Sequence, residues 1–265
     1  MTLDIQRKQR EQEFHDTYFN AAEIRASQSR FYSDLVQNAL LDRALALVDG
    51  VAGGMVLHLG CGSNLEIPNR FLERGAQKVC SIDLSSVACR AVRDGLKNKK
   101  EESWRYVAVM DAEQLGFAAE SFDVVFGRAI VHHLDLDAIS AELFRVLKPG
   151  GQAVLIEPLG INPLINRYRR RTPEARTVDE HPLDASDLRK LADRFGGMRA
   201  EYLFLTQLIP IVLLSKVQRG ALYRACFTAF GAIDRCLYAV LPCLRKYSWC
   251  VVFSVAKRLR TDREF

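Results

Sequence analysis

Between residues 55 and 158, short apolar segments alternate with segments whose apolar residues recur every three or four positions. The short segments have the length and composition of buried strands, and the periodic segments are typical of amphipathic helices. This alternation predicts a mostly parallel β-sheet with helices on both faces, in which ligands bind beyond the carboxyl ends of the strands. The expected strands are residues 55–59, 78–85, 105–111, 122–129 and 152–159.

The segments that flank this alternation suggest how the chain is organised. Residues 1–48 predict an N-terminal helical cap, and residues 49–265 predict one sheet domain. Two insertions interrupt the later part of that domain. Residues 159–185 are rich in proline and arginine and predict a loop, whereas residues 207–246 predict two or three apolar helices. The remaining expected elements are a helix at 185–195 and strands at 199–206 and 247–257.

Charge and cysteine content narrow the class of protein. The chain has 37 Lys and Arg residues against 32 Asp and Glu, a net charge of +5 that does not by itself indicate nucleic-acid binding. The seven cysteines form no C-x-x-C pair and no Cys/His cluster with zinc spacing, so we predict reduced thiols and no metal site. No apolar run reaches the roughly 18 residues of a membrane span, and the N-terminus lacks a secretory signal. We expect a cytoplasmic chain, with contact to a membrane surface as an open alternative.

The segment "VLHLGCGSN", residues 56–64, ends an apolar strand in two glycines. A strand followed by a glycine turn is typical of loops that bind a nucleotide. Loops that bind NAD follow the pattern G-x-G-x-x-G, in which the third glycine lets the helix pack closely against the strand. Gly60 and Gly62 fit this pattern, but Leu65 occupies the third position. The sequence therefore argues against NAD.

Five segments in order resemble a known family. They are "VLHLGCGSN", "VCSIDLS", "VMDAEQLGF", "SFDVVFGRAIVHHL" and "AELFRVLKPGGQAVLIEP". In this order and spacing they resemble the class I S-adenosylmethionine (SAM)-dependent methyltransferases over residues 50–160, and among these the small-molecule branch of quinone biosynthesis. The resemblance implies a doubly wound, Rossmann-like α/β fold with a mostly parallel seven-stranded sheet whose last strand is antiparallel. It also implies SAM as the cofactor and S-adenosyl-L-homocysteine as the product.

The resemblance also implies roles for individual residues in the cofactor site. Gly60 and Gly62 let the backbone approach the methionine part of SAM. Asp83 accepts hydrogen bonds from the ribose hydroxyls, Asp111 accepts from the adenine amino group, and the backbone near Arg128 holds the methionine ammonium. The full set of expected cofactor-binding residues is His58, Gly60, Cys61, Gly62, Asn64, Asp83, Leu84, Asp111, Ala112 and Arg128.

Two positions depart from the family pattern. His58 stands where an acidic residue is usual, and Asn64 replaces the third glycine. Asparagine tolerates a left-handed backbone, so the loop can still form. A neutral imidazole at position 58 can hydrogen-bond around the ligand or make SAM binding pH-dependent, but it can also be satisfied by a neighbouring carbonyl. Asp83 likewise has an alternative role, as the N-cap of a helix.

The candidate catalytic residues follow the strands of the predicted sheet. Methyl transfer from a sulfonium requires alignment of nucleophile, methyl and sulfur, and a base helps when the nucleophile is a hydroxyl. We expect His133 near the transferred methyl and His132 turned inward. Further candidates are His15, Glu157 and His181, and the two histidines among them could instead make local hydrogen bonds.

The candidate substrate-binding residues come from three segments. Arginine suits bidentate recognition of carboxylate or phosphate, so we expect Arg170 and Arg176 to hold an anionic group of the substrate. The 207–246 insertion predicts a lid over a lipophilic substrate, with Phe227 and Phe230 lining the pocket. Tyr18 and Tyr32 of the N-terminal helices would close the same pocket. The alternatives are a solvated arginine loop and helices that pack on the sheet edge or dimerise.

The sequence thus predicts a SAM-dependent methyltransferase for a small, partly hydrophobic or anionic metabolite. Oxygen is the favoured acceptor atom, with carbon and nitrogen open, and both a monomer and a homodimer fit. An RNA methyltransferase is the first alternative, opposed by the lack of an appended recognition module and of aromatic residues among the basic ones. A non-catalytic partner-binding protein of the same fold, supported by His58 and Asn64, is the second. A membrane-surface protein is the third.

Overall fold

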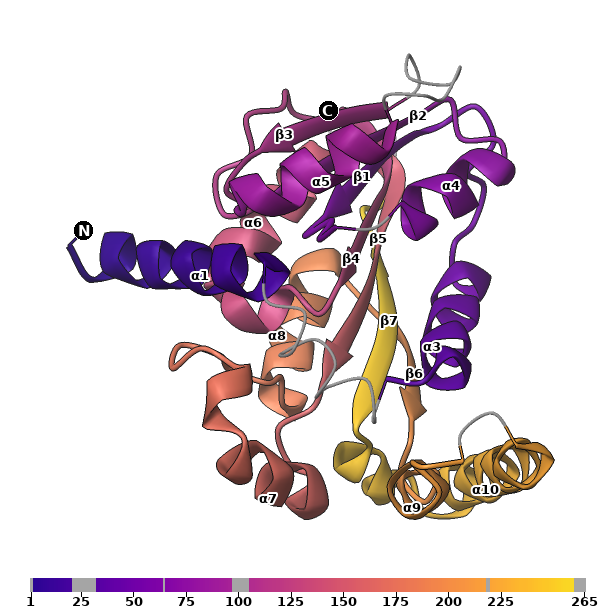
Figure 1. Cartoon of the computed structure of the whole chain (residues 1–265). Helices are drawn as coiled ribbons and strands as arrows, with labels where there is room; N and C mark the ends of the chain where they lie inside the picture. The colour runs from indigo at the N-terminus through magenta and orange to yellow at the C-terminus, as the bar shows by residue number, and fades with distance from the viewer. Residues whose placement is uncertain (1, 21–31, 64, 97–104, 218–219, 260–265) are drawn as a thin grey trace.

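A seven-stranded sheet forms the centre of the molecule (Figure 1). The computed structural model describes residues 2–20, 32–63, 65–96, 105–217 and 220–259. The strand order is β3-β2-β1-β4-β5-β7-β6, and β7 runs antiparallel to both of its neighbours while the other pairs are parallel. The predicted fold class is confirmed. The strands are β1 Met55–Leu59, β2 Lys78–Asp83, β3 Arg105–Val109, β4 Phe122–Arg128, β5 Leu147–Pro158, β6 Arg199–Leu203 and β7 Cys250–Ala256.

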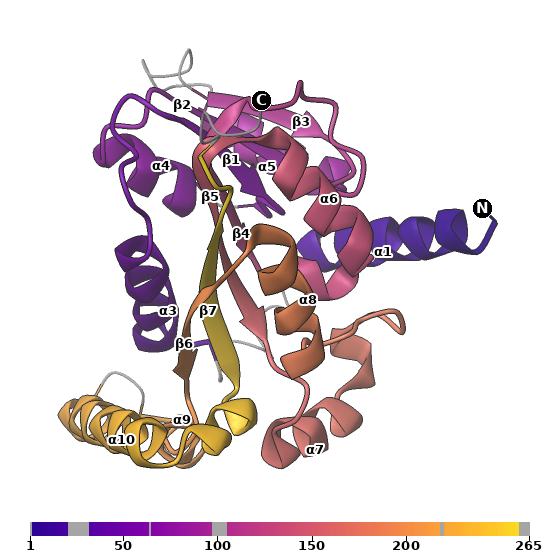
Figure 2. The ribbon, with the colours of Figure 1, turned by 180° about the vertical axis from the view of Figure 1, so that it is seen from behind.

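Helices cover both faces of the sheet. Figures 1 and 2 show α3 and α4 on one side and α6 and α8 on the other. The helices are α1 Thr2–Asn20, α3 Asp34–Ala46, α4 Glu66–Glu73, α5 Ser86–Leu96, α6 Leu136–Val146, α7 Pro163–Arg171, α8 Ala185–Phe195, α9 Leu208–Leu213 and α10 Ala221–Val240. The described residues also include the short 3₁₀ helices η2 Val131–His133, η3 Pro173–Ala175 and η4 Pro242–Tyr247.

The side chains of alternate residues in each central strand pack into two different hydrophobic cores, one on each face of the sheet. On β4, Phe126 packs with the core under α3 and α4, while Val125 packs with the core under α6 and α8. Both residues are fully buried. Side chains of successive strand residues point to opposite faces, so a strand covered on both sides reads as a continuous apolar run. This is why "FDVVFG" predicts a central strand of a parallel sheet.

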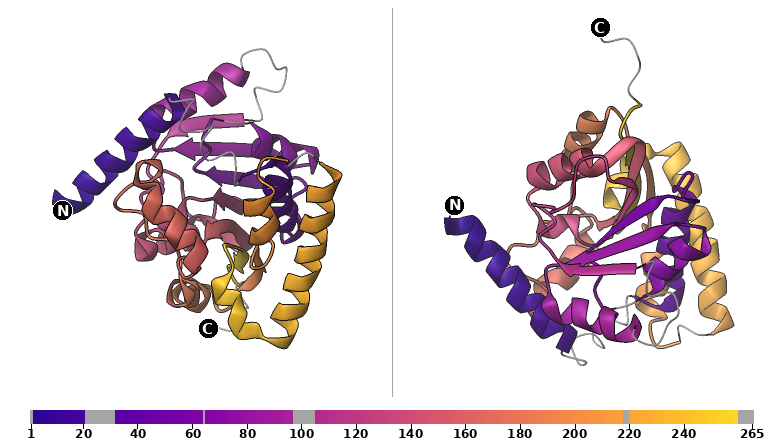
Figure 3. Two further views of the ribbon diagram at one scale, coloured as in Figure 1. Left: turned by 60° about the horizontal axis from the view of Figure 1, so that its bottom comes forward. Right: turned by 90° about the horizontal axis from the view of Figure 1, so that it is seen from above.

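Helix α1 lies beside α5, as both views of Figure 3 show, and is tied to the loops at the carboxyl ends of the parallel strands. Asp16 of α1 accepts a hydrogen bond from Ser85 Oγ at 2.5 Å. Arg7 and Lys8 form ion pairs with Glu113, whose side chain is only 4% exposed. The N-terminal segment predicted as a helical cap therefore supplies α1 to this edge. Part of that segment, residues 21–31, lies outside the described residues.

Two local expectations were wrong. The segment "KPGG", residues 148–151, whose proline and glycines predict a turn before the fifth strand, instead belongs to β5, which begins at Leu147 and pairs with β4 through a register shift. The predicted loop over 159–185 contains helix α7, because Pro163 occupies its first turn, where proline is tolerated, and Asn162 caps its N-terminus. The three consecutive arginines therefore lie in the last turn of a helix, where their charge favours the helix dipole.

The apolar insertion over 207–246 forms α9, α10 and η4. Phe227 of α10 is 5% exposed and packs against Phe204 and Tyr223. Asp234 of α10 accepts hydrogen bonds from the backbone of residues 205–207, which fixes the chain after β6 to the helix. Within the described residues, no helix is long and apolar enough to cross a membrane.

Candidate active site

The glycine turn after β1 has the backbone geometry that the sequence predicts. Gly60 and Gly62 both have a positive φ, +60° and +55°. A Cβ atom on Gly60 would also lie 2.8 Å from Cδ1 of Ile130. A side chain at position 60 would therefore be strained by the backbone conformation and would have to displace the Ile130 side chain, which favours glycine there. The backbone N–H of Cys61 donates to the carbonyl of Ile82 at 2.9 Å, which joins the turn to the end of β2.

Asp83 at the end of β2 faces this turn. Its carboxylate accepts hydrogen bonds from the backbone N–H groups of Gly62 at 2.9 Å and Ser85 at 2.8 Å. Burial raises the pKa of Asp83, although the two N–H donors favour the ionised form. A carboxylate oxygen has more than one lone pair, so both oxygens can still accept hydrogen bonds from a ligand.

A cavity of about 390 Å³ opens beside the turn and Asp83. It brings together every described residue of the predicted cofactor set. These are His58, Gly60, Cys61, Gly62, Asp83, Leu84, Asp111, Ala112 and Arg128. Asn64, the remaining member, lies outside the described residues.

Helix α1 also lines this cavity with the predicted His15 and Tyr18, and it adds Arg7, Lys8 and Glu11, which the sequence alone did not indicate. Lys8 contacts Asp111 at 2.8 Å and Glu113 at 2.9 Å, so the carboxylate expected to face adenine also binds a lysine. The only signal was opposite charge in two segments about a hundred residues apart, which does not identify a contact. The α1 residues in this cavity are Arg7, Lys8, Glu11, His15, Tyr18 and Phe19.

His58 sits in the cavity wall as a buried, neutral imidazole. It is 1% exposed, and its Nδ1 atom has no hydrogen-bond partner among the described residues. Burial, together with the positive charge of Arg128, lowers the pKa of His58 to about 3. The expectation of a ring satisfied by a neighbouring carbonyl therefore fails for Nδ1. A buried polar atom without a partner is costly unless a ligand supplies one.

Arg128 ends β4 and lines the same cavity. Its guanidinium donates to the side-chain oxygen of Gln37 on α3. Burial lowers the pKa of Arg128. A buried guanidinium keeps its positive charge. This end of the cavity therefore carries a positive charge, and the hydrogen-bond partner of that charge, the Gln37 amide, is neutral.

A second cavity of about 220 Å³ adjoins the first. The two cavities share His15, Tyr18, Ala129 and His133 as lining residues. Apolar and aromatic side chains form much of the second wall, and Arg169 and Arg176 add two cations. The aromatic lining residues are Phe14, Tyr18, Tyr32, Tyr168 and Trp249.

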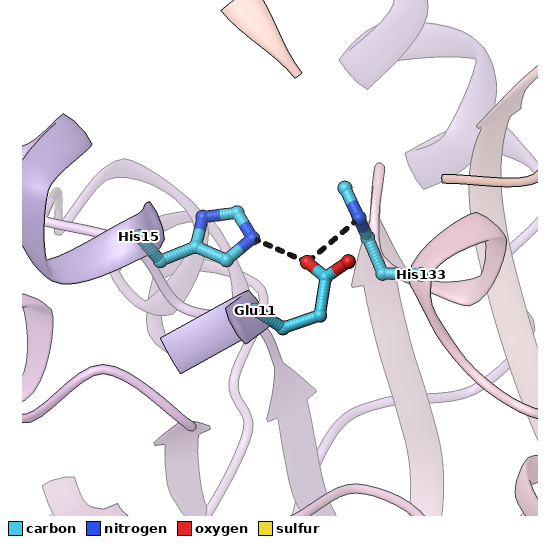
Figure 4. A group of neighbouring side chains, drawn as sticks. All are labelled: Glu11, His15 and His133. Atoms are coloured by element: carbon cyan, nitrogen blue, oxygen red, sulfur yellow. Dashed lines mark ion pairs between the residues drawn. The ribbon is translucent and has the colours of Figure 1, made fainter. Parts of the chain in front are cut away.

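Two neighbouring histidines divide into an inner and an outer one, as the sequence predicts. The Nδ1 atom of His132 lies 2.7 Å from Glu157 Oε2, and the side chain is only 6% exposed. Burial lowers the pKa of His132, and the nearby His133 ring contributes in the same direction. His133 faces α1, where its Nδ1 lies 3.1 Å from Glu11 Oε2. The same Glu11 oxygen lies 3.6 Å from His15 Nε2 (Figure 4).

Two of the predicted catalytic residues lie outside the walls of both cavities. Glu157 is fully buried behind the turn after β4, residues 129–133, and its Oε1 accepts hydrogen bonds from the backbone N–H groups of Ile130 and Val131. The side chain of His181 is 70% exposed and pairs with Asp187 at 3.1 Å. The expectation that His181 acts in catalysis is wrong in this geometry, because its ring points to the surface.

Some of the predicted substrate-binding residues line the second cavity and others do not. Tyr18, Tyr32 and Arg176 line the second cavity, and Arg176 lies 3.6 Å from Glu180. Arg170 is exposed instead, and Arg169 takes its place because it lies one helical turn after the buried Ile165 on the inner face of α7.

The lid predicted over 207–246 is not in the cavity walls. Among the described residues, none of the positions that line the two cavities belongs to this segment. Phe227 is part of the core, and the carbonyl of Phe230 accepts a hydrogen bond from Thr206. Phe227 instead lines a separate cavity of about 490 Å³ that residues of α3 and β6 also line. The expectation that Phe227 and Phe230 line the substrate pocket therefore does not fit the cavity that adjoins the predicted cofactor residues.

Comparison with known proteins assigns residues 57–155 to a family described as a methyltransferase domain. Demethylmenaquinone methyltransferase of Thermobifida fusca is 36% identical over 126 residues, which is 45% of this chain and 51% of that protein. Phosphatidylethanolamine N-methyltransferase of Cereibacter sphaeroides is 30% identical over 105 residues, 39% of this chain and 50% of that protein. The chain spans about half the length of these curated relatives.

Solved structures share the same fold over most of the chain. Geranyl diphosphate C-methyltransferase of Streptomyces coelicolor A3(2), in complex with Mg²⁺, geranyl diphosphate and S-adenosyl-L-homocysteine, superposes with a TM-score of 0.61. The superposition covers 84% of this chain and 80% of that one at 14% sequence identity. At this identity the likeness establishes the fold.

Proposed function

We propose that this chain, which carries a class I SAM-dependent methyltransferase domain, transfers a methyl group from SAM to an oxygen of a small, partly hydrophobic and anionic acceptor. One observation carries the proposal. The cavity that gathers the predicted cofactor residues meets a second, aromatic cavity at His15 and His133. A methyl donor in the first cavity and an acceptor in the second would meet at these two histidines.

The groups that line the first cavity match the functional groups of SAM. The Nδ1 atom of His58, which has no partner among the described residues, can accept a hydrogen bond from the methionine ammonium. Arg128 can bind the methionine carboxylate, and Asp83 can accept from the ribose hydroxyls. When bound, SAM supplies a sulfonium-activated methyl group.

The residues of this chain then act by alignment and by handling a proton. The walls of the two cavities fix the acceptor oxygen relative to the donor, and such alignment supplies much of the rate enhancement in a displacement on carbon. The acceptor hydroxyl must lose its proton as it becomes an ether. His15 and His133 are the imidazole side chains common to both cavities, so they face this proton.

The second cavity supports an acceptor with an apolar body and an acidic group. Tyr32, Tyr168 and Trp249 offer flat apolar contacts, and Arg169 and Arg176 offer charge. The names of the relatives contain a demethylmenaquinone, a phosphatidylethanolamine and geranyl diphosphate, which are all lipophilic molecules. Phenols and hydroxy acids with an apolar body are therefore the first acceptors to test.

Calorimetric titration with SAM tests the donor half of this proposal. Asp83→Ala is expected to weaken SAM binding by at least tenfold, because the ribose hydroxyls lose a charged acceptor. Asp193→Ala, a change on the exposed face of α8, is the matched control and should leave the affinity unchanged. Transfer of labelled methyl from SAM to a panel of phenols and hydroxy acids then tests the acceptor half. Absence of SAM binding by the folded wild type would overturn the proposal.

A further inference from the structure

We propose that Glu11, His15 and His133 form a binding site for a divalent transition-metal ion where the two cavities meet. One carboxylate oxygen and one nitrogen from each imidazole lie within 4.8 Å of one another. Figure 4 shows the three side chains converging from α1 and from the turn after β4. The sequence predicts no metal site, because Glu11 and His15 are separated from His133 by more than a hundred residues.

The spacing of the ligand atoms matches a shared ion. Glu11 Oε2 lies 3.1 Å from His133 Nδ1 and 3.6 Å from His15 Nε2. With metal–ligand distances near 2.1 Å, adjacent ligand atoms are about 3.0 Å apart in an octahedron and about 3.4 Å apart in a tetrahedron. The two distances from the Glu11 oxygen are thus within a few tenths of an ångström of those values, and the two imidazole nitrogens lie within 4.8 Å of each other, so the rings can close on an ion by a small side-chain adjustment.

Two of these ligand atoms are buried and unsatisfied. Glu11 Oε2 and His133 Nδ1 lie 3.1 Å apart, which is an ion pair if the ring is protonated, but neither atom makes a hydrogen bond of good geometry with any described residue. Glu11 as a whole is 4% exposed. Leaving such atoms unpaired is unfavourable, and a cation between them would satisfy both at once.

Neighbouring groups orient the ligands. Thr177 donates its hydroxyl to Glu11 Oε1 at 2.5 Å, which leaves Oε2 as the oxygen that faces the histidines. Arg7 donates to the carbonyl of His133 at 2.8 Å and holds its backbone against α1. Glu11 and His15 are one helical turn apart, so they project from the same face of α1. Hydrogen bonds of this kind to the outer atoms of ligands are typical of metal sites.

The ligand set indicates the class of ion. Two imidazoles with one carboxylate suit zinc, iron, cobalt, nickel or manganese better than magnesium or calcium, which prefer all-oxygen sites. Three protein ligands also leave coordination positions open, as in catalytic rather than structural sites. Both histidines line both cavities, so an open position is accessible from the acceptor side.

A role for the ion rests on the proposed function. An ion at this place would bind the hydroxyl oxygen of the acceptor and lower its pKa, so that the proton passes to bulk water. The oxygen then forms a bond to the methyl carbon as the bond from that carbon to the sulfonium sulfur breaks. The electron pair of the broken bond stays on sulfur, which leaves a neutral thioether. Ion binding itself requires neither SAM nor acceptor.

Titration of the metal-free full chain with Zn²⁺ tests the site directly. We expect one Zn²⁺ per chain, with affinity reduced at least 100-fold in His15→Ala and in His133→Ala. Thr177→Val removes no ligand and should weaken Zn²⁺ binding by 10- to 100-fold. His181→Gln is the matched control, since this histidine also pairs with an acid but lies on the surface, and it should keep the wild-type affinity.

Visible absorption of bound Co²⁺ provides a second, independent test of the metal site. Co²⁺ bound by two histidines and a carboxylate absorbs in the visible range, and we expect this band in wild type and in His181→Gln but not in His15→Ala. Circular dichroism of each variant shows whether it is folded. Zn²⁺ binding by wild type that is no tighter than that of folded His15→Ala would overturn the site.

Measuring Zn²⁺ binding together with SAM binding and methyl transfer distinguishes failure of the metal-site proposal from failure of the proposed function. Zn²⁺ binding that depends on the three residues, in a chain that binds no SAM, would support the site and overturn the function. SAM binding and methyl transfer that persist in a chelator, with no specific Zn²⁺ binding, would support the function and overturn the site. In that case the three side chains act as a proton-handling group without an ion.

Discussion

The carboxylate of Glu157 on β5 lies 2.7 Å from the Nδ1 atom of His132 in the turn after β4, and both side chains are buried. The second carboxylate oxygen accepts two backbone N–H groups, from Ile130 at 3.0 Å and Val131 at 2.8 Å. Glu157 is thus a positioning residue. It holds the turn whose next residue, His133, faces both cavities.

Glu157→Gln should therefore lower the free energy of unfolding. An amide has one acceptor oxygen, so either the two backbone donors or His132 must face an NH₂ group. The expected loss is about 2–3 kcal/mol, since buried donors lose a charged partner. Urea denaturation measures it, with Glu174→Gln on the exposed η3 segment as the control. A loss below about 0.5 kcal/mol would show that the turn does not depend on this carboxylate.

Gly60→Ala and Gly53→Ala form a matched pair. Both glycines have a positive φ, +60° and +71°, but a Cβ at Gly53 meets nothing within 4 Å whereas one at Gly60 meets Ile130 at 2.8 Å. The conformation alone should cost each variant about 1–2 kcal/mol of stability. Gly60→Ala should lose more and should also lose SAM binding, because the turn must move. Calorimetry showing equal SAM affinity in the two variants would contradict the preference for glycine at position 60.

The buried His58 should make stability depend on pH. Its pKa is about 3 in the folded chain against an ordinary 6.5, so the unfolded chain binds the proton first as pH falls. Stability is therefore intact above pH 6.5 and declines below it, by about 2 kcal/mol between pH 7 and pH 5. His58→Asn cannot titrate and should lack this part of the decline. Parallel urea denaturation at the two pH values measures the difference, and identical declines would argue that His58 is not held neutral.

Arg169 should contribute to acceptor affinity more than its neighbours in the arginine run. It lines the second cavity, where burial lowers its pKa and its Nη1 donates to the carbonyl of Leu159 at 3.0 Å. Arg169→Gln should raise KM for an anionic acceptor roughly tenfold with little change in kcat, as expected when binding is lost equally in ground and transition states. Arg171→Ala, on the exposed end of α7, should leave KM unchanged. Equal effects of the two changes would argue against an anion site on α7.

Local sequence patterns predicted the sheet correctly, and they predicted a set of cofactor residues that the fold brings together. The strand–turn signals around Gly60 and Asp83 depend on backbone rules that act within a few residues, and the parallel fold then brings the ends of neighbouring strands to one edge. The described residues of the predicted cofactor set line one cavity for this reason. Asp111 lies among them because β3 ends beside β2.

The features that sequence reasoning missed depend on long-range packing. Arg169 rather than Arg170 reaches the cavity because this segment forms helix α7. The sequence did not reveal the helix, because a proline in the first turn of a helix cannot be told from a proline in a loop by sequence alone. Phe227 has the composition of a pocket residue, yet the sheet edge buries it first. Glu11 meets His133 only because α1 docks across the strand ends, a contact that opposite charges on distant segments do not specify.

Helix α1 lies outside the 57–155 segment that matches the methyltransferase family, yet it supplies His15 and Tyr18 to the boundary between the two cavities. Under the proposed function, the methyl donor lies against the sheet and its glycine turn, and the acceptor lies partly against this helix. We therefore expect substitutions on one face of α1 to change which molecule is methylated while leaving the central sheet intact.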